Sequence, residues 1–217
     1  MSELFDEVDE DVRRDQLKKL WDQYSLFIVA GALLIIASVG GWRGYEYLEA
    51  KKAAEAGAAF DKAVELSEQN KHTEAEAAFA DLAAKAPSGY RVLARLRVAA
   101  EVASRDPQAA AKMFDDMAAD RSVGGPEQDL ARVRAAQLLL ETSTYPNLLQ
   151  RLEAAAGPGA TFRHTARELL ALSAWRANDM TAARQWLDQI ANDGETPPSL
   201  RSRAEALQAL LPPVAKS

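Results

Sequence analysis

The stretch QYSLFIVAGALLIIASVGGW, Gln23–Trp42, holds twenty consecutive uncharged residues between Asp22 and Arg43. An α-helix rises about 1.5 Å per residue, so about 20 residues cross the hydrocarbon core of a bilayer. Aromatic residues flank such helices at the two membrane interfaces. The sequence therefore predicts a single transmembrane helix over residues 23–42. Its predicted membrane-interface residues are Trp21, Tyr24, Trp42 and Arg43.

Residues 1–22 carry eight acidic and four basic residues, a net charge of −4. A cleaved signal peptide begins with a basic region, so this leader does not fit one, although Ser38-Val39-Gly40 would serve as a cleavage site. A buried core helix is the other alternative, but core helices rarely have so long an uncharged run. We predict an acidic cytoplasmic tail over 1–22, disordered around Asp6–Asp11, with a short juxtamembrane helix.

The Lys and Arg residues near the two ends of the run suggest an orientation. Four precede the run, and three follow it closely, namely Arg43, Lys51 and Lys52. Cytoplasmic loops of membrane proteins carry the excess of Lys and Arg, so this small difference predicts a cytoplasmic N-terminus. A cytoplasmic location for the large domain is the alternative. Gly40 and Gly44 have the spacing at which two membrane helices pack closely, which leaves oligomerisation open.

The remaining residues, 43–217, are rich in alanine and place most of their glycines and prolines in short clusters. Between the clusters, apolar residues recur at i, i+3, i+4 and i+7, the pattern of amphipathic helices. The membrane helix meets no proline, so we expect it to continue to about Gln69. Further helices are expected at about 73–85, 90–104, 107–120, 127–142, 146–156, 161–178, 180–192 and 199–211.

The spacing of small and large apolar residues predicts tetratricopeptide-like repeats. Ala75, Phe79, Leu82 and Pro87 have the order and offsets of the second helix of that repeat. The small residue lets two helices approach closely, and the larger ones fill the space between them. The same trio recurs 35, 38 and 35 residues further on, with Leu148 replacing the small residue in the third copy. These copies are Ala110, Phe114 and Met117; Leu148, Leu152 and Ala155; and Ala183, Leu187 and Ile190.

The predicted fold class is therefore all-α: a single N-terminal transmembrane helix, then a tetratricopeptide-like helical-hairpin solenoid with a C-terminal capping helix. About four degenerate repeats occupy 43–198, and the capping helix with the C-terminal tail occupies 199–217. The last helix covers the open end of the stack, which such solenoids need for solubility. A helical bundle without repeats is the alternative.

In this order of features the protein resembles the ancillary SecYEG translocon subunit family. The resemblance rests on the tail, the apolar run, Gly41-Trp42-Arg43 and two helix segments, 58–63 and 93–99. It implies a bacterial inner-membrane protein whose periplasmic repeats bind translocon subunits, a periplasmic chaperone and secretory chains. Cell-division coordinators share such repeats, so a structural scaffold of a division or envelope complex that binds no client polypeptides is the alternative.

The sequence gives little support for catalysis, a cofactor, a metal site or nucleic-acid binding. The two histidines, His72 and His164, are 92 residues apart, and the protein has no cysteine. Gly124-Gly125-Pro126 follows no strand and is interpreted as a connector between helices rather than a phosphate loop. From Arg43 onward, 22 basic and 24 acidic residues nearly balance, which does not favour nucleic acid. We predict that the protein is not an enzyme.

Six arginines fall on the expected first helices of the repeats, which line the concave face of such solenoids. We predict that they bind carboxylates of a protein partner, because guanidinium groups pair with carboxylates through two parallel hydrogen bonds. The alternative is that they pair with Glu101, Glu127, Glu168 or Asp179 of the same molecule. The predicted partner-binding residues are Arg91, Arg95, Arg132, Arg163, Arg167 and Arg176.

Overall fold

The computed structural model describes the backbone of residues 3–212, and the side chains of Lys18, Trp21, 23–27 and 29–212. Over this range the protein is built from α-helices without a strand, which confirms the all-α prediction. It divides into two compact units, 1–54 and 55–217. Each unit is described by itself below.

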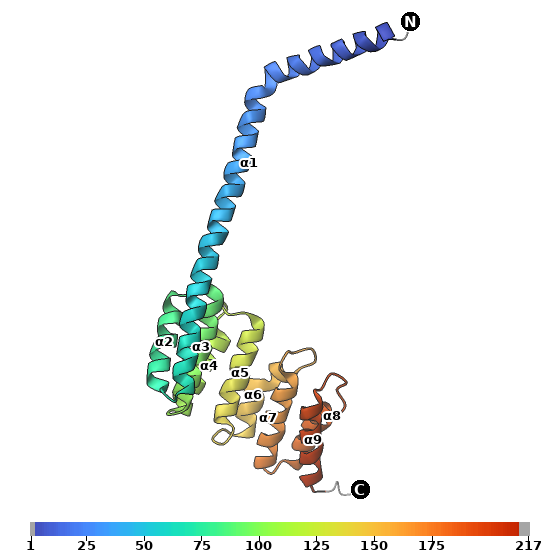
Figure 1. Cartoon of the computed structure of the whole chain (residues 1–217). Helices are drawn as coiled ribbons and strands as arrows, with labels where there is room; N and C mark the ends of the chain where they lie inside the picture. Colours follow the sequence, from blue (N-terminus) through green and yellow to red (C-terminus); the bar gives the residue numbers. More distant parts are fainter. Residues whose placement is uncertain (1–2, 213–217) are drawn as a thin grey trace. The chain divides into compact units, whose positions relative to one another are not determined.

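The first unit consists of the N-terminal part of α1 (Glu3–Glu68), one continuous helix (Figure 1). The apolar run makes this helix long and apolar enough to cross a membrane. None of its most apolar window is buried, and Leu26, Leu34 and Ile36 are largely exposed, which does not fit a core helix. The backbone is helical from Glu3, and so through Asp6–Asp11, where we expected disorder; the side chains of Asp6–Asp11 lie outside the described residues.

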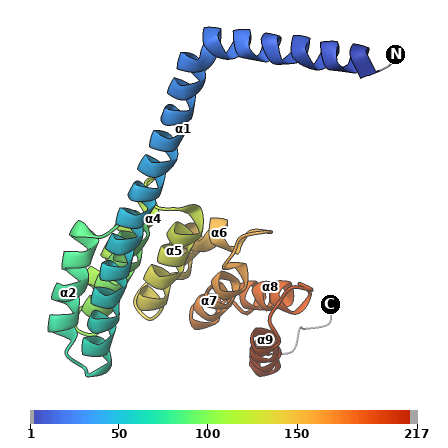
Figure 2. The same ribbon diagram turned by 45° about the horizontal axis from the view of Figure 1, so that its top comes forward.

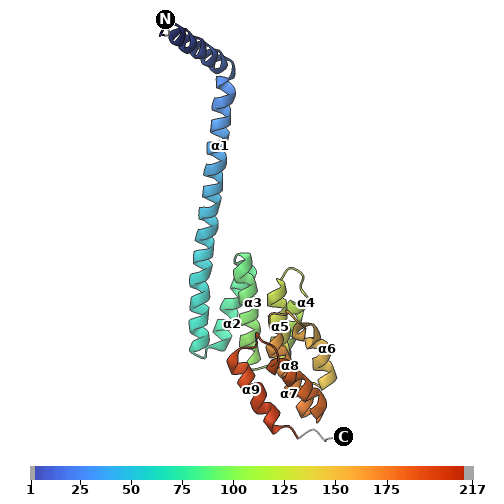
Figure 3. The same ribbon diagram turned by 90° about the vertical axis from the view of Figure 1, so that its right-hand side faces the viewer.

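The second unit stacks successive antiparallel helices (Figures 1 and 3). Residues 55–68 of α1 supply the first helix of the first repeat, since Ala56 and Ala63 share a buried cluster with Ala75 and Phe79. Helix α9 packs against α8 at the C-terminal end (Figure 2). After α1 the helices are α2 (His72–Lys85), α3 (Ser88–Ala103), α4 (Pro107–Ala119), α5 (Gly125–Leu139), α6 (Tyr145–Ala156), α7 (Arg163–Arg176), α8 (Met180–Ala191) and α9 (Pro198–Leu210).

The ends of these helices follow local backbone chemistry. Asp106 and Asp179 cap α4 and α8, each carboxylate accepting a hydrogen bond from a backbone N–H at 2.9 Å. A proline lies in the first turn of α4, α5, α6 and α9, where a missing N–H does no harm. Helix α5 ends at Leu139, earlier than expected, because the backbone tightens there: the N–H groups of Leu140 and Thr142 bond to carbonyls three residues back, at 3.4 and 3.1 Å.

Two hairpin turns have the same backbone geometry. Asn70 between α1 and α2, and Asn178 between α7 and α8, have φ of 60° and 61°. Asparagine tolerates this left-handed region better than most other residues that have a Cβ atom. The Lys71 N–H then bonds to the Leu66 carbonyl at 3.0 Å, and the equivalent bond after Asn178 is 2.9 Å. These bonds satisfy the last carbonyls of each helix and reverse the backbone direction within two residues.

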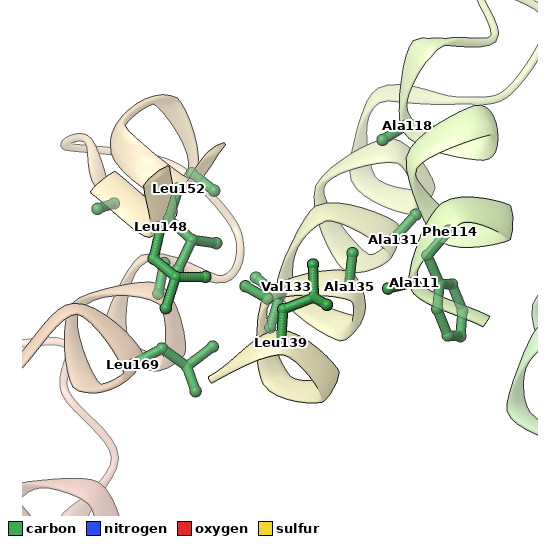
Figure 4. Close-up of a cluster of buried hydrophobic side chains, with 14 of the residues drawn as sticks. Ala111, Phe114, Ala118, Ala131, Val133, Ala135, Leu139, Leu148, Leu152 and Leu169 are labelled. Carbon is green, nitrogen blue, oxygen red and sulfur yellow. The ribbon is translucent and has the colours of Figure 1, made fainter. Parts of the chain in front are cut away.

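The core lies between the second helices (α2, α4, α6 and α8) and the first helices that flank them. Every residue of the four spaced trios is buried, none of them more than 7% exposed. Figure 4 shows Leu148 and Leu152 of α6 directed toward Val133 and Leu139 of α5. Alanines occupy much of the remaining core, so neighbouring helices approach closely.

Candidate protein-binding groove

A cavity of about 550 Å³ opens on the first helices α3 and α5 of the second unit. It is mostly apolar and is wide enough for side chains of a bound polypeptide. It is called the groove below. Its lining residues are Phe60, Leu93, Leu96, Arg97, Ala100, Ala103, Phe114, Leu130, Arg134, Gln137 and Leu138.

Helical periodicity places these side chains on one face of each helix. On α3, Leu93, Leu96, Arg97 and Ala100 are spaced three or four residues apart, while Ala94 and Val98 lie on the buried face. On α5 the groove residues are spaced in the same way. Leu93 is 47% exposed, an apolar side chain that a partner would cover. Leu96, Leu130 and Leu138 beside it are partly exposed, and an apolar hollow of this kind is a typical binding surface.

The charged residues of the groove are both cations. Arg97 on α3 and Arg134 on α5 lie 37 residues apart and occupy equivalent positions in consecutive repeats. The Arg134 guanidinium donates to Gln137 Oε1 at 3.3 Å. The lining contains no Asp or Glu, so both guanidinium groups offer donors to an incoming carboxylate.

The predicted arginines of α3 and α5 lie outside this groove. Arg91 is exposed in the first turn of α3. Arg95 Nη1 lies 2.7 Å from Asp120 Oδ2 and ties α3 to the loop after α4. Arg132 Nη1 donates to Asp129 Oδ1 at 2.6 Å, and Arg132 Nη2 donates to a carbonyl of α4. The guanidinium groups of Arg95 and Arg132 are therefore engaged within the domain.

The three predicted arginines of α7 are likewise engaged within the domain. Arg163 Nε and Arg167 Nη1 donate to Asp193 Oδ2 at 2.8 and 3.0 Å, and Arg167 Nε also donates to the Ala156 carbonyl. Arg176 donates to carbonyls of the α5–α6 loop. The acidic partners are therefore Asp120, Asp129, Asp193 and Glu195, not the four acidic residues considered from the sequence.

Sequence reasoning missed Arg97 and Arg134, although the sequence contained a signal for them. Each lies two residues after a predicted arginine, and each lies four residues after a leucine, Leu93 or Leu130. Two residues along a helix correspond to a rotation of about 200°, which places a side chain on the opposite face. The leucine spacing identifies the exposed apolar face, and therefore the arginines that belong to it.

Two carboxylates that hold the domain together have lowered pKa values. Hydrogen bonds from Ser122 and Arg95 lower the pKa of Asp120 to about 2. Asp193 is affected more strongly: the Arg163 guanidinium, followed by the Glu195 backbone N–H and other donors, holds its pKa far below the usual range. Both groups stay ionised at neutral pH and act as fixed acceptors.

The histidines contact carboxylates separately. His72 Nδ1 lies 2.7 Å from Glu101 Oε2, and Ser67 Oγ donates to the other oxygen of this buried carboxylate at 2.6 Å. His164 Nε2 lies 3.1 Å from Asp193 Oδ2. The described residues contain no group of three or more His, Asp or Glu that could hold a metal ion. The first contact joins α2 to α3, and the second joins α7 to the loop between α8 and α9.

The predicted membrane-interface residues belong to the first unit. Trp21, Tyr24 and Trp42 are exposed, as the side chains at the ends of a membrane helix would be before lipid covers them. The Arg43 guanidinium lies 3.5 Å from a carboxylate oxygen of Glu46, one turn further along the helix.

A family model described as a tetratricopeptide repeat-like domain matches residues 18–185. The match therefore includes the apolar run, the helices that carry the first three trios, and the first half of α8 with Ala183 of the fourth. Comparison with curated proteins and with solved structures found no match.

Proposed function

Since the chain belongs to the tetratricopeptide repeat-like domain family, we propose that it is a membrane-tethered adaptor that binds protein partners in the groove. Domains of this type generally mediate protein–protein interaction and are generally non-enzymatic. The observation that carries the proposal is the groove on α3 and α5, with exposed apolar side chains and two guanidinium groups. This lining fits a polypeptide segment that presents apolar and acidic side chains.

The apolar part of α1 would keep the groove concentrated next to a membrane complex. Tethering to one surface raises the effective concentration of a binding site without adding any contact. In this proposal 1–22 is the acidic cytoplasmic tail, 23–42 the transmembrane helix, 43–198 the repeat domain, and 199–217 the capping helix with the C-terminal tail. The charge difference across the apolar run supports a cytoplasmic N-terminus.

The partner that we propose is the Sec translocon of the bacterial inner membrane. This proposal is supported by the resemblance to the ancillary SecYEG translocon subunit family in the order of tail, apolar run and repeat helices. The resemblance implies a periplasmic domain that links the translocon to chaperones and secretory chains. Such polypeptides emerge unfolded and expose the apolar segments that this groove fits. A division or envelope scaffold uses the same kind of repeat, so the experiment must separate the two functions.

Site-specific photo-crosslinking in intact membranes tests this proposal. A photo-reactive amino acid that replaces Leu93 lies in the groove, whereas one that replaces Lys112 lies on an exposed position of α4 outside it. We expect crosslinks to translocon subunits, chaperones or secretory proteins from position 93 only. Combined Arg97→Glu and Arg134→Glu substitutions should lower the yield several-fold, because they reverse both charges. The charge-reversing Lys112→Glu is the matched control.

Two outcomes would contradict the proposal at different levels. Recovery of division proteins alone from position 93 would exclude the translocon but leave the groove as the binding site. Equal crosslinking from positions 93 and 112 would show that the groove is not the binding site.

A further inference from the structure

Helix α9 is a first helix without a second helix within residues 3–212. The helices α1, α3, α5 and α7 are each followed by a second helix that packs beside them, whereas α9 ends the stack (Figure 1). Helix α7 begins at Arg163 and α9 at Pro198, and each begins seven residues after the preceding helix ends. Residues of α9 therefore correspond to residues of α7 that lie 35 positions earlier. This correspondence identifies the face of α9 that a further helix would cover.

On α7, the alanines that face α8 are buried, but the equivalent alanines of α9 are exposed. Ala171 and Ala174 are at most 2% exposed and share a buried cluster with side chains of α8. Ala206 and Ala209 lie 35 residues after them and are exposed. Leu210 lies on the same face, one turn after Ala206, and is 65% exposed. These three residues of α9 are called the end face below.

Helix α9 is held firmly to the domain by its other faces. Ala204 is buried against α8. The Arg203 guanidinium donates to both carboxylate oxygens of Glu168 on α7, at 2.8 and 2.7 Å. Gln208 Nε2 donates to Asp188 Oδ1 of α8 at 2.6 Å. The end face is therefore presented on a helix whose position is already fixed, which lowers the entropic cost of binding.

The described residues after α9 turn toward α8 and leave the end face uncovered. Leu211 is buried in the cluster formed with α7 and α8. Arg184 of α8 donates to the Pro212 carbonyl at 2.7 Å. A terminal helix of a solenoid normally keeps a polar outer face for solubility. The apolar end face of α9 departs from that rule, because up to Pro212 no segment packs on it.

The end face has the spacing of a second helix as well as that of a first helix. In α2, α4 and α8 an alanine precedes the large apolar residue of the trio by four positions, and Ala206 precedes Leu210 by the same four. The small residue allows a close approach, and the large one fills the space beside it. Successive helices of the stack are antiparallel. An antiparallel pair of α9 helices related by a two-fold axis places Ala206 of each copy against Leu210 of the other.

The charges of α9 permit this pairing. Arg203 lies outside the contact and keeps its internal partner Glu168. Glu205 lies toward the start of the helix, so the two copies of Glu205 are about 9 Å apart along the helix axis, on opposite sides of the two-fold axis. No like charges face one another at the centre of the pair.

The contact is small, so its strength depends on the membrane tether. Helix α9 has 13 residues and is about 20 Å long. A pair of such helices buries less than the roughly 1,200 Å² of stable interfaces. Attachment of both copies to one membrane raises their effective concentration, which favours a contact of this size.

We propose that the end face is a self-association site, through which α9 of one copy packs antiparallel against α9 of a second copy. This goes beyond the adaptor function and does not involve the groove. The dimer has two grooves, so partners that present two binding segments gain affinity without any new contact in either groove.

Disulfide trapping of the full-length protein in native membranes tests the proposal. The protein has no cysteine, so Ala209→Cys introduces a single thiol. Position 209 lies next to the two-fold axis of the pair, where its two copies come within the span of a disulfide. Two copies with different affinity tags are expressed together and oxidised with copper phenanthroline. We expect a disulfide-linked product that contains both tags.

Ala154→Cys is the matched control, because Ala154 is an exposed alanine near the C-terminal end of α6. It should give little disulfide-linked product. If positions 209 and 154 gave equal yields, the product would reflect random collision, and the proposal would be overturned. A product that joins one copy to a different protein would also overturn it, since another partner would then cover the end face.

Charge substitutions test the facing of the two helices. In the Ala209→Cys protein, Leu210→Glu in both copies should lower the yield several-fold, because it places a carboxylate in an apolar contact. Leu210→Glu in one copy and Ala206→Lys in the other should restore the product that contains both tags, since opposite charges then face each other. Ala154→Glu should leave the yield unchanged. Circular dichroism should show that all variants remain folded, because the substituted residues are exposed.

Failure of the Leu210→Glu and Ala206→Lys pair to restore the product would overturn the antiparallel arrangement. Failure of the adaptor proposal would look different, because it concerns crosslinking of partners from position 93. The Arg97→Glu and Arg134→Glu substitutions should leave the yield from position 209 unaffected.

Discussion

Among single residues, Asp193 lies in a loop but accepts hydrogen bonds from several residues. Its carboxylate accepts hydrogen bonds from Arg163, Arg167 and the Glu195 N–H, and its carbonyl accepts one from Arg201 of α9. These bonds join α7 to the loop between α8 and α9. Charge-assisted hydrogen bonds of this kind are stronger than neutral ones. The end of the stack is therefore held by ion pairs as well as by its apolar core.

These ion pairs predict a loss of stability in acid. A carboxyl group whose folded pKa is lowered stabilises the fold fully above its unfolded pKa, about 3.9 for Asp. That contribution is lost as pH falls toward the folded pKa, which is about 2 for Asp120. We expect the free energy of unfolding to fall steeply between about pH 4 and pH 2, measured by urea denaturation. Asp120→Asn and Asp193→Asn should each lower stability at neutral pH and flatten this dependence.

Asp116 offers a control for the acid effect. It pairs with Lys112 at 3.0 Å on an exposed helix face, and such surface pairs contribute little. Asp116→Asn should leave both the neutral stability and its pH dependence nearly unchanged. An unaltered pH profile in Asp193→Asn would contradict the role of its carboxylate.

At the scale of the elements, the two asparagine turns set how α1 meets α2 and how α7 meets α8. Asn70→Ala and Asn178→Ala should each lower the free energy of unfolding by about 1 kcal/mol, because a positive φ is less favourable for alanine than for asparagine. Asn70→Gly should be neutral or stabilising, since glycine has no Cβ. Thermal and urea denaturation measure these differences.

Asn192 provides the matched position for the turn substitutions, since it ends α8 with φ of −87°. Asn192→Ala should cost much less than Asn70→Ala. If all three alanine substitutions had the same effect, the left-handed geometry would not be the cause.

The helices themselves could largely be predicted from the sequence, because their apolar periodicity and their Gly and Pro clusters are local signals. The face of each first helix was harder to predict. Alanine is abundant on α3 and α5, and a small apolar residue such as Ala94 or Ala100 does not reveal whether it is buried or exposed. The contacts of Asp193 could not be predicted, because its partners lie on α7, 26 to 30 residues away, and only the fold brings them together.

Leu148 gives a second example of this limit. The sequence shows it as an exception in the third trio. In the structure Leu148 is fully buried in a core cluster with residues of α4, α5, α6 and α7, and that set of neighbours depends on how the helices pack together. A spacing pattern identifies where a repeat is irregular, but not which residues surround the irregular position.

At the scale of the whole molecule, the adaptor proposal requires the tail and the repeat domain to lie on opposite sides of the membrane. The protein has no cysteine, so single cysteines introduced by substitution report their location without background. Lys85→Cys, at an exposed position of α2, should react with a membrane-impermeant maleimide in intact cells. Ser2→Cys, in the tail, should react only after the inner membrane is permeabilised. The reverse pattern would establish a cytoplasmic repeat domain.

The side chains of the groove and those of the core occupy opposite faces of the same first helices. In the course of evolution, substitutions at Leu93, Arg97, Leu130 or Arg134 can therefore change which partners are recognised without disturbing the packing that holds the repeats together. Phe114 is different, because it belongs to both the groove lining and the buried core. Among related proteins, we expect the residues at these four groove positions to vary with the partner, while the residue at position 114 changes more slowly.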